Sequence, residues 1–265
     1  MYMTNSSRIL RPAIILGMLV FIGAVIVAVV AFNSMQAQRG SVGAPTSVPS
    51  QTVPQPSIPA ETAAPQPPVT NDIYDEAGAF VASLPVTVID PSKPLPKYER
   101  EAQFGAAWID VDGNGCDTRN DILKRDFATF ETFRGDCEVQ TGVLNDVYTG
   151  KTIQFTHTNA FGKKTGDSSA VQIDHVIPLS WAWQNGASVW DEDTRILFAN
   201  DPVNLKAVEG KQNSAKKDQG PSTWWPSDQS YHCTYAVDFT AVLQKYELTI
   251  PAADKDALVE TLAGC

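Results

Sequence analysis

Near the start of the chain, residues 13–32 form an unbroken apolar stretch. A proline-rich segment follows, and apolar and polar positions are then mixed to the end of the sequence. An uncharged run of about twenty residues is long enough for one helix to span a bilayer. Arg8 and Arg11 precede this run, so we expect residues 1–39 to form a cytoplasmic tip and a transmembrane anchor that leaves the remainder exported. A cleaved signal peptide is the alternative, although residues near Ala31 and Ala37 make poor cleavage sites.

Residues 40–72 lack the apolar positions that a core needs. Pro, Ser, Thr, Ala, Val and Gln dominate the segment, and Glu61 is its one charged residue between positions 40 and 70. Such a composition favours an extended, partly polyproline spacer of about 3 Å per residue. We therefore predict a disordered linker.

From residue 73 onward the apolar spacing predicts one globular domain, residues 73–265, of the α+β class. Apolar residues three and four apart predict a helix over residues 73–84, which Pro85 ends. A hairpin is expected over residues 139–155, where turn-forming residues separate two apolar runs. Further helices are predicted over residues 118–130, 179–185, 191–199, 237–246 and 254–262.

An Asp-His pair at the end of an alternating run gives the domain its clearest candidate chemistry. Residues 171–179 predict a strand that carries Asp174 and His175 and is stopped by Pro178. The pair places a carboxylate, which can hold a cation, beside an imidazole, which can take a proton.

Two more elements follow this strand with polar residues at regular places. Residues 202–208 predict a short strand carrying Asn204, and residues 211–218 predict a polar helix carrying Asn213. Lys216 and Lys217 are expected on the face of Asn213, because positions three and four apart on a helix are neighbours.

The strand, strand, helix order with these residues resembles the HNH (ββα-metal) endonucleases. The resemblance covers roughly residues 98–265 and implies a ββα-metal nuclease core surrounded by helices. The chain looks like the exported actinobacterial branch of that family at residues 110–119, Trp183, residues 198–202 and the closing Cys265. Related domains occur in modification-dependent restriction enzymes.

The resemblance also implies roles for individual residues. Asp174 and Asn213, at a position where many members have His, hold one divalent cation, Mg²⁺ or Mn²⁺. His175 removes a proton from the attacking water, and Asn204 or a nearby carbonyl orients it. The expected reaction is hydrolysis of phosphodiester bonds in DNA, leaving a 5′ phosphate.

Charge complicates an interaction with nucleic acid. Residues 73–265 hold 17 Lys and Arg against 28 Asp and Glu, a balance that does not attract a polyanion. Arg119 is expected either to clamp a phosphate during catalysis or to form a structural salt bridge. A set of lysines on the motif either binds the phosphate backbone or is the ordinary solvated face of a polar helix: Lys206, Lys211, Lys216 and Lys217.

Four cysteines lie in the predicted domain, widely spaced and without a CxxC pair. This spacing argues against a zinc knuckle and, behind an export signal, favours two disulfides. Of the three possible pairings we expect Cys116 with Cys137 and Cys233 with Cys265, because each closes a loop of moderate length.

A short acidic cluster before the predicted helix at 118–130 offers a second ion site. Asp110, Asp112, Asn114 and Asp121 follow the order of oxygen ligands in a calcium loop. Clusters of Asp, Asn and Gly also occur simply as turns, so both interpretations stay open.

The sequence thus predicts an exported, membrane-anchored, metal-dependent HNH endonuclease with no evident protein partner. A catalytically inactive binding or scaffold domain of the cell wall is the alternative. A metallopeptidase is disfavoured because the chain has no His-Glu-x-x-His motif.

Overall fold

The structure is a computed structural model that describes residues 72–88, 90–133 and 135–265. The expected membrane anchor and all but the last residue of the expected linker lie outside these ranges. Within them, no helix combines the length and hydrophobicity that a bilayer crossing requires.

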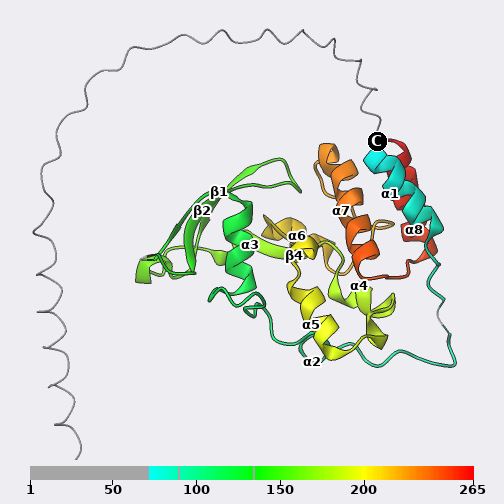
Figure 1. Cartoon of the computed structure of the whole chain (residues 1–265). Helices are drawn as coiled ribbons and strands as arrows, with labels where there is room; N and C mark the ends of the chain where they lie inside the picture. Colours follow the sequence, from blue (N-terminus) through cyan, green and yellow to red (C-terminus); the bar gives the residue numbers. More distant parts are fainter. Residues whose placement is uncertain (1–71, 89, 134) are drawn as a thin grey trace, which may run out of the picture. The chain divides into compact units, whose positions relative to one another are not determined.

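The described domain combines helices with two small antiparallel sheets, which confirms the α+β class (Figure 1). The helices predicted from apolar spacing at both ends of the domain and between the motif strands are present. The α-helices are α1 (Asp72–Ser83), α2 (Arg100–Phe104), α3 (Thr118–Asp126), α4 (Leu179–Gln184), α5 (Glu192–Asn200), α6 (Gly210–Lys216), α7 (His232–Lys245) and α8 (Ala252–Ala263). The strands are β1 (Phe127–Thr132), β2 (Val139–Asn145), β3 (Thr152–Thr156), β4 (Val171–His175) and β5 (Leu205–Glu209).

The first sheet, in the order β1-β2-β3, contains the predicted hairpin as β2 and β3. The helix predicted over residues 118–130 is wrong in its last turn, because α3 ends at Asp126 and the chain continues as β1. Phe127 causes the change: it pairs with Leu144, and its ring lies over Gly142, where any Cβ would collide with it. Packing between strands therefore overrides the helical spacing of these residues.

The second sheet carries the Asp-His pair. Strands β4 and β5 run antiparallel, with Asp174 opposite Lys206, and α6 packs against both strands. The strand predicted over residues 202–208 begins later, because Pro202–Asn204 forms a 3₁₀ turn, η4. Gly210 lets α6 start close to the 3₁₀ turn η2 (Ser168–Ala170) before β4, since a Cβ there would collide with the carbonyl oxygen of Ser169.

Helix α6 is also shorter than predicted. It ends at Lys216, and Lys217 adopts a left-handed backbone conformation with φ of 55°. Lys217 therefore leaves the helix and does not share a helical face with Asn213.

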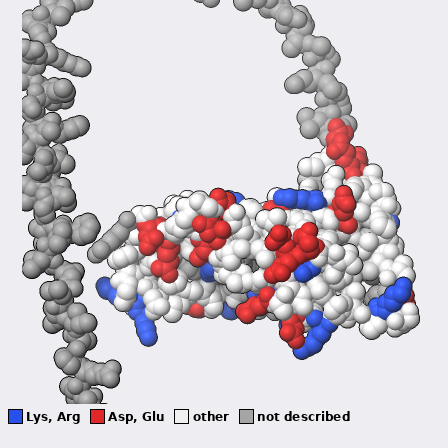
Figure 2. All heavy atoms as spheres, turned by 60° about the horizontal axis from the view of Figure 1, so that its bottom comes forward, with Lys and Arg blue, Asp and Glu red and all other residues white. Residues whose placement is uncertain are grey.

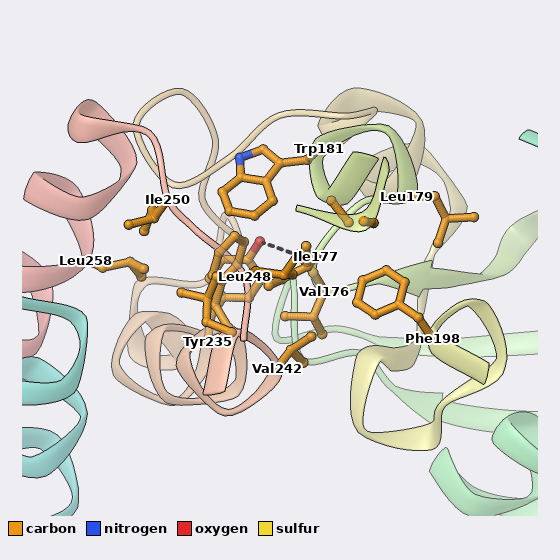
Figure 3. Packing of buried hydrophobic residues seen from close by; sticks show 14 of the residues in the cluster. Val176, Ile177, Leu179, Trp181, Phe198, Tyr235, Val242, Leu248, Ile250 and Leu258 are labelled. Carbon is orange, nitrogen blue, oxygen red and sulfur yellow. Dashed lines mark hydrogen bonds between the residues drawn. The ribbon is translucent and has the colours of Figure 1, made fainter. Parts of the chain in front are cut away.

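Two apolar clusters hold the second sheet in place. One packs Ile173 and Leu205 against α3 and the first sheet. The other cluster packs the residues that follow β4 against α4 and α7. Figure 3 shows Val176 and Ile177 in this cluster, where the carbonyl oxygen of Val176 accepts a hydrogen bond from the Tyr235 hydroxyl. The end of β4 is thus fixed from both sides.

Both predicted disulfides are confirmed. Cys116 pairs with Cys137 across 21 residues, and Cys233 pairs with Cys265 across 32 residues. The first joins the loop before α3 to the loop before β2, and the second ties the last residue to the first turn of α7.

Candidate active site

An open cavity of about 400 Å³ lies at the end of β4. Its walls come from β4, α6, the start of α3 and the loop segment that contains α2. Among its lining residues are five that the sequence predicted: Arg119, Asp174, His175, Asn213 and Lys217. Tertiary structure therefore brings the candidate acid, base and amide together.

His175 lies at the cavity with one ring nitrogen free. Its Nε2 donates to the carbonyl oxygen of Ala199 at 2.8 Å, so Nε2 carries the proton and Nδ1 holds the basic lone pair. Nδ1 has no hydrogen-bond partner among the described residues. Burial lowers the pKa of His175 to about 3, opposed by the Ala199 hydrogen bond and assisted by the nearby charges of Arg100 and Lys216. The imidazole is therefore neutral at ordinary pH, and the lone pair on Nδ1 is unprotonated.

Asp174 is held from behind by two donors. The Lys216 ammonium and the Tyr148 hydroxyl each donate to its Oδ2 at 2.6 Å. Burial raises the pKa of Tyr148, which keeps the hydroxyl protonated. The other oxygen, Oδ1, has no partner among the described residues, so it is the atom that Asp174 offers to the cavity.

Asn213 presents a second oxygen. Its Nδ2 donates to Oε1 of Gln172 at 2.9 Å, which orients the amide and leaves Oδ1 without a partner in the described part of the chain. Gln172 and Asp174 are two residues apart in β4, so both side chains lie on the face of the strand that is toward α6. A carboxylate oxygen and an amide oxygen therefore face one cavity, and hard cations such as Mg²⁺ prefer oxygen ligands.

Three cationic side chains line the same cavity without a salt bridge in the described residues: Arg100, Arg119 and Lys217. Arg119 donates once, to the carbonyl oxygen of Val171 at 3.1 Å. Burial lowers the pKa of Arg119, and Asp117 opposes that effect. Asp218 lies in the lining too and accepts from Ser180 at 3.3 Å. The cavity thus collects positive charge in an acidic domain; on the face that Figure 2 shows, separate acidic clusters lie between smaller basic ones.

Asn204 does not reach the cavity, and the prediction that it orients His175 is wrong. Its amide is fully buried and pairs with the backbone of Ile177, accepting from the N–H at 2.8 Å and donating to the carbonyl at 3.2 Å. The alternative prediction was that a nearby carbonyl orients the imidazole, and the carbonyl of Ala199 does so. Asn204 clamps the turn η4 to the segment that follows β4.

The structure separates the four lysines of the predicted phosphate-binding patch. Lys216 is 0% exposed, so its assignment to nucleic-acid binding is wrong. Lys206 forms an ion pair with Asp238 at 3.0 Å, and Lys211 is exposed but does not line the cavity. Lys217 is the member of the set that lies at the cavity.

Comparison with known proteins adds to this geometry. The family described as "GmrSD restriction endonucleases, C-terminal domain" matches residues 117–261, more than half of the chain. The chain belongs to this family. Like the GmrSD C-terminal domains, it is therefore related to restriction endonucleases, whereas the finer HNH and actinobacterial assignments stay predictions.

The chain is also similar to a protein described as secreted. An "Uncharacterized secreted protein" of Arthroderma benhamiae (strain ATCC MYA-4681 / CBS 112371) is 37% identical over 205 residues, which cover 77% of this chain and 93% of the relative. No solved structure matches the chain.

Part of the cavity lies outside the GmrSD match and was missed by the sequence reasoning. Tyr98, Arg100 and Trp108 precede residue 117 and line the cavity. Trp108 stacks on the His175 ring, with centroids 6.1 Å apart and planes 16° apart, and has a left-handed φ of 60°. No motif surrounds these residues, so apart from the aromatic and basic residues themselves the sequence carried no signal.

The residues of the predicted calcium loop do not line this cavity. Asp110 accepts three backbone N–H bonds from its own loop, and Asn114 donates to both Asp112 and Asp121. The described residues contain no cluster of three or more His, Cys, Asp or Glu side chains suited to a metal ion. These bonds are those of an ordinary turn, and calcium binding stays a prediction.

Proposed function

We propose that the described domain is a ββα-metal (HNH) endonuclease that hydrolyses phosphodiester bonds in DNA. The observation that carries the proposal is a neutral imidazole, with Nδ1 free, in the same cavity as the free oxygens of Asp174 and Asn213. Membership of a restriction-endonuclease family supports a nucleic-acid substrate.

His175 is the general base of this proposal. Its Nδ1 accepts the proton of the water that attacks phosphorus, and the fixed Nε2 bond to Ala199 keeps the lone pair directed at the cavity. The same bond stabilises the imidazolium that forms, because the carbonyl dipole faces the protonated ring. The Trp108 indole lies nearly parallel to this ring, with the planes 16° apart.

Asp174 and Asn213 fit a single divalent cation, Mg²⁺ or Mn²⁺, because both offer an unpaired oxygen to the cavity. When bound, such an ion supplies stabilisation of the charge that develops on the phosphate and on the departing 3′ oxygen. Arg119 and Lys217 bind the phosphate backbone from the other walls, Arg119 through the guanidinium donors that Val171 does not use.

We also propose that the protein works outside the cytoplasm. Two disulfides are typical of proteins in an oxidising compartment, and the secreted relative supports export of this chain. The membrane anchor predicted within residues 1–39 belongs to the same proposal. External protease should remove the domain from intact cells if the anchor is uncleaved.

Cleavage of supercoiled plasmid, single-stranded DNA and RNA by the full-length chain tests the activity, with EDTA or with added Mg²⁺ or Mn²⁺. His175→Ala should lower the rate by about 10²–10⁴, the usual contribution of a positioned base. His157→Ala is the matched control, because His157 lies outside the cavity beside Glu138 and should leave the rate unchanged.

Two outcomes would contradict the proposal. A folded His175→Ala protein that cuts at the wild-type rate removes His175 from the chemistry. An absence of cleavage of all three substrates in every metal would favour the inactive binding domain instead.

A further inference from the structure

We propose that Lys216 is a positioning residue that neutralises Asp174, so that the divalent cation binds tightly only together with a phosphodiester. This inference rests on the proposed function and concerns the order in which ion and substrate occupy the site. It assigns a role to a lysine that the sequence placed on the protein surface.

The ammonium of Lys216 is fixed by its surroundings. Its three protons match three acceptors: Oδ2 of Asp174 at 2.6 Å, the carbonyl of His175 at 2.6 Å and the carbonyl of Val176 at 3.1 Å. The side chain is 0% exposed, and Nζ lies 5.6 Å from the centroid of the Trp224 ring. A buried charge with this full set of partners cannot move to bind solvent or substrate.

This arrangement limits what Asp174 can give to a cation. Lys216 and Tyr148 together saturate Oδ2, which leaves Oδ1 as the one oxygen available for a metal. The carboxylate and the ammonium also cancel each other's charge at hydrogen-bonding distance. The protein therefore offers the cation one carboxylate oxygen whose negative charge is already neutralised.

The rest of the cavity does not replace that charge. The Asn213 amide carries no charge, and no cluster of three or more His, Cys, Asp or Glu side chains suited to a metal occurs among the described residues. Arg100, Arg119 and Lys217 add positive charge, against the single further carboxylate of Asp218. Divalent cations gain their affinity from anionic oxygens, so the missing charge has to come from a phosphate.

The expected behaviour is reciprocal coupling between ion and substrate. Mn²⁺ alone should bind the full-length chain weakly, and a phosphorothioate DNA oligonucleotide that resists cleavage should tighten Mn²⁺ binding at least tenfold. Calorimetry or the electron spin resonance signal of free Mn²⁺ measures this affinity without any turnover.

Substitution of Lys216 distinguishes a lysine that neutralises Asp174 from one that is merely structural. Mn²⁺ affinity should rise in the first case and fall in the second. Lys216→Met keeps the length of the side chain and removes its charge, so Asp174 regains its full negative charge. Mn²⁺ alone should then bind about tenfold more tightly, the effect of one unit charge on a divalent ion at roughly 6 Å even in high dielectric. A merely structural lysine would weaken Mn²⁺ binding when replaced, because Asp174 would lose its position.

Two matched variants separate the effect of the Lys216 charge from the effect of its hydrogen bond to Asp174 and from the effect of its buried position. Tyr148→Phe removes the other donor to Oδ2 without changing charge, and it should not tighten Mn²⁺ binding. Lys217→Met removes the same charge from the exposed rim, where solvent screens it, and should tighten binding less than Lys216→Met.

The wild-type titration tests the inference even if Lys216→Met fails to fold. Tight Mn²⁺ binding that does not change with the oligonucleotide overturns the inference, and if DNA is still cleaved the proposed function survives. Weaker Mn²⁺ binding by folded Lys216→Met also overturns it. If Mn²⁺ binds under neither condition, the metal site itself is wrong and the proposed function fails with the inference.

Discussion

The low pKa of His175 makes a quantitative prediction about pH and activity. A free histidine has a pKa near 6.5, and burial lowers that of His175 to about 3. The difference corresponds to roughly 5 kcal/mol of preference for the neutral ring. At pH 5.5 an exposed histidine would be about nine-tenths protonated, whereas His175 stays almost wholly neutral.

We therefore expect kcat/KM for DNA cleavage to stay nearly constant from pH 8 to pH 5, apart from ionisations on the metal or substrate. The assay is cleavage of a fluorogenic DNA hairpin at constant ionic strength and constant free Mg²⁺. A rise of tenfold per pH unit that levels off near pH 6.5 would refute the reasoning, because it would mean that the ring is solvated in the working enzyme.

The same group affects stability, with a definite sign. The pKa of His175 is lower in the folded protein than in the unfolded chain, so its contribution is complete above pH 6.5 and is lost as pH falls toward 3. The slope from this one residue is about 1.4 kcal/mol per pH unit. Urea unfolding at pH 7 and pH 5 should show a smaller loss for His175→Ala than for the wild type, and equal losses would contradict burial of the neutral ring.

Three further predictions concern other residues. Asn204→Ala should lower the free energy of unfolding by about 2–4 kcal/mol, because it leaves the buried N–H and carbonyl of Ile177 unpaired; a cost under 1 kcal/mol in urea unfolding would exclude the clamp. Replacing Cys233 and Cys265 together by Ser should cost about 2–4 kcal/mol in the same measurement, and an unchanged midpoint would mean that this disulfide adds nothing to stability. Arg119→Met should lower kcat/KM for DNA by roughly tenfold to hundredfold through the loss of a charged hydrogen bond, and full activity would restrict Arg119 to its contact with Val171.

Local pattern was sufficient for much of the fold. The helices at both ends of the domain follow from apolar residues spaced to cover one face, and the hairpin of β2 and β3 follows from two apolar runs around a turn. Spacing alone could not separate α3 from β1. Phe127 continues the helical period of Ile122 and Leu123, and it becomes a strand residue only because it pairs with Leu144 and places its ring over Gly142 of β2.

The candidate site was predictable where neighbours in sequence are neighbours in space. Asp174 and His175 are such a pair, and Asn213 was found through the order of elements around it. Lys216 was misplaced because a lysine in a polar helix is normally solvated, and its three partners lie 40 or more residues earlier in the chain. Asn204 was misplaced for the same reason, since Ile177 lies 27 residues away.

The disulfides and the cavity wall have a consequence for how the domain can be divided. A fragment trimmed to residues 117–261, the extent of the family match, would separate Cys137 from Cys116 and Cys233 from Cys265, leaving two unpaired thiols. It would also lack α1, which packs on α7 and α8, and Trp108, whose indole stacks on His175. Inactivity or aggregation of such a fragment would therefore reflect where it was cut, and the smallest unit suited to biochemical work begins near residue 72 and includes Cys265.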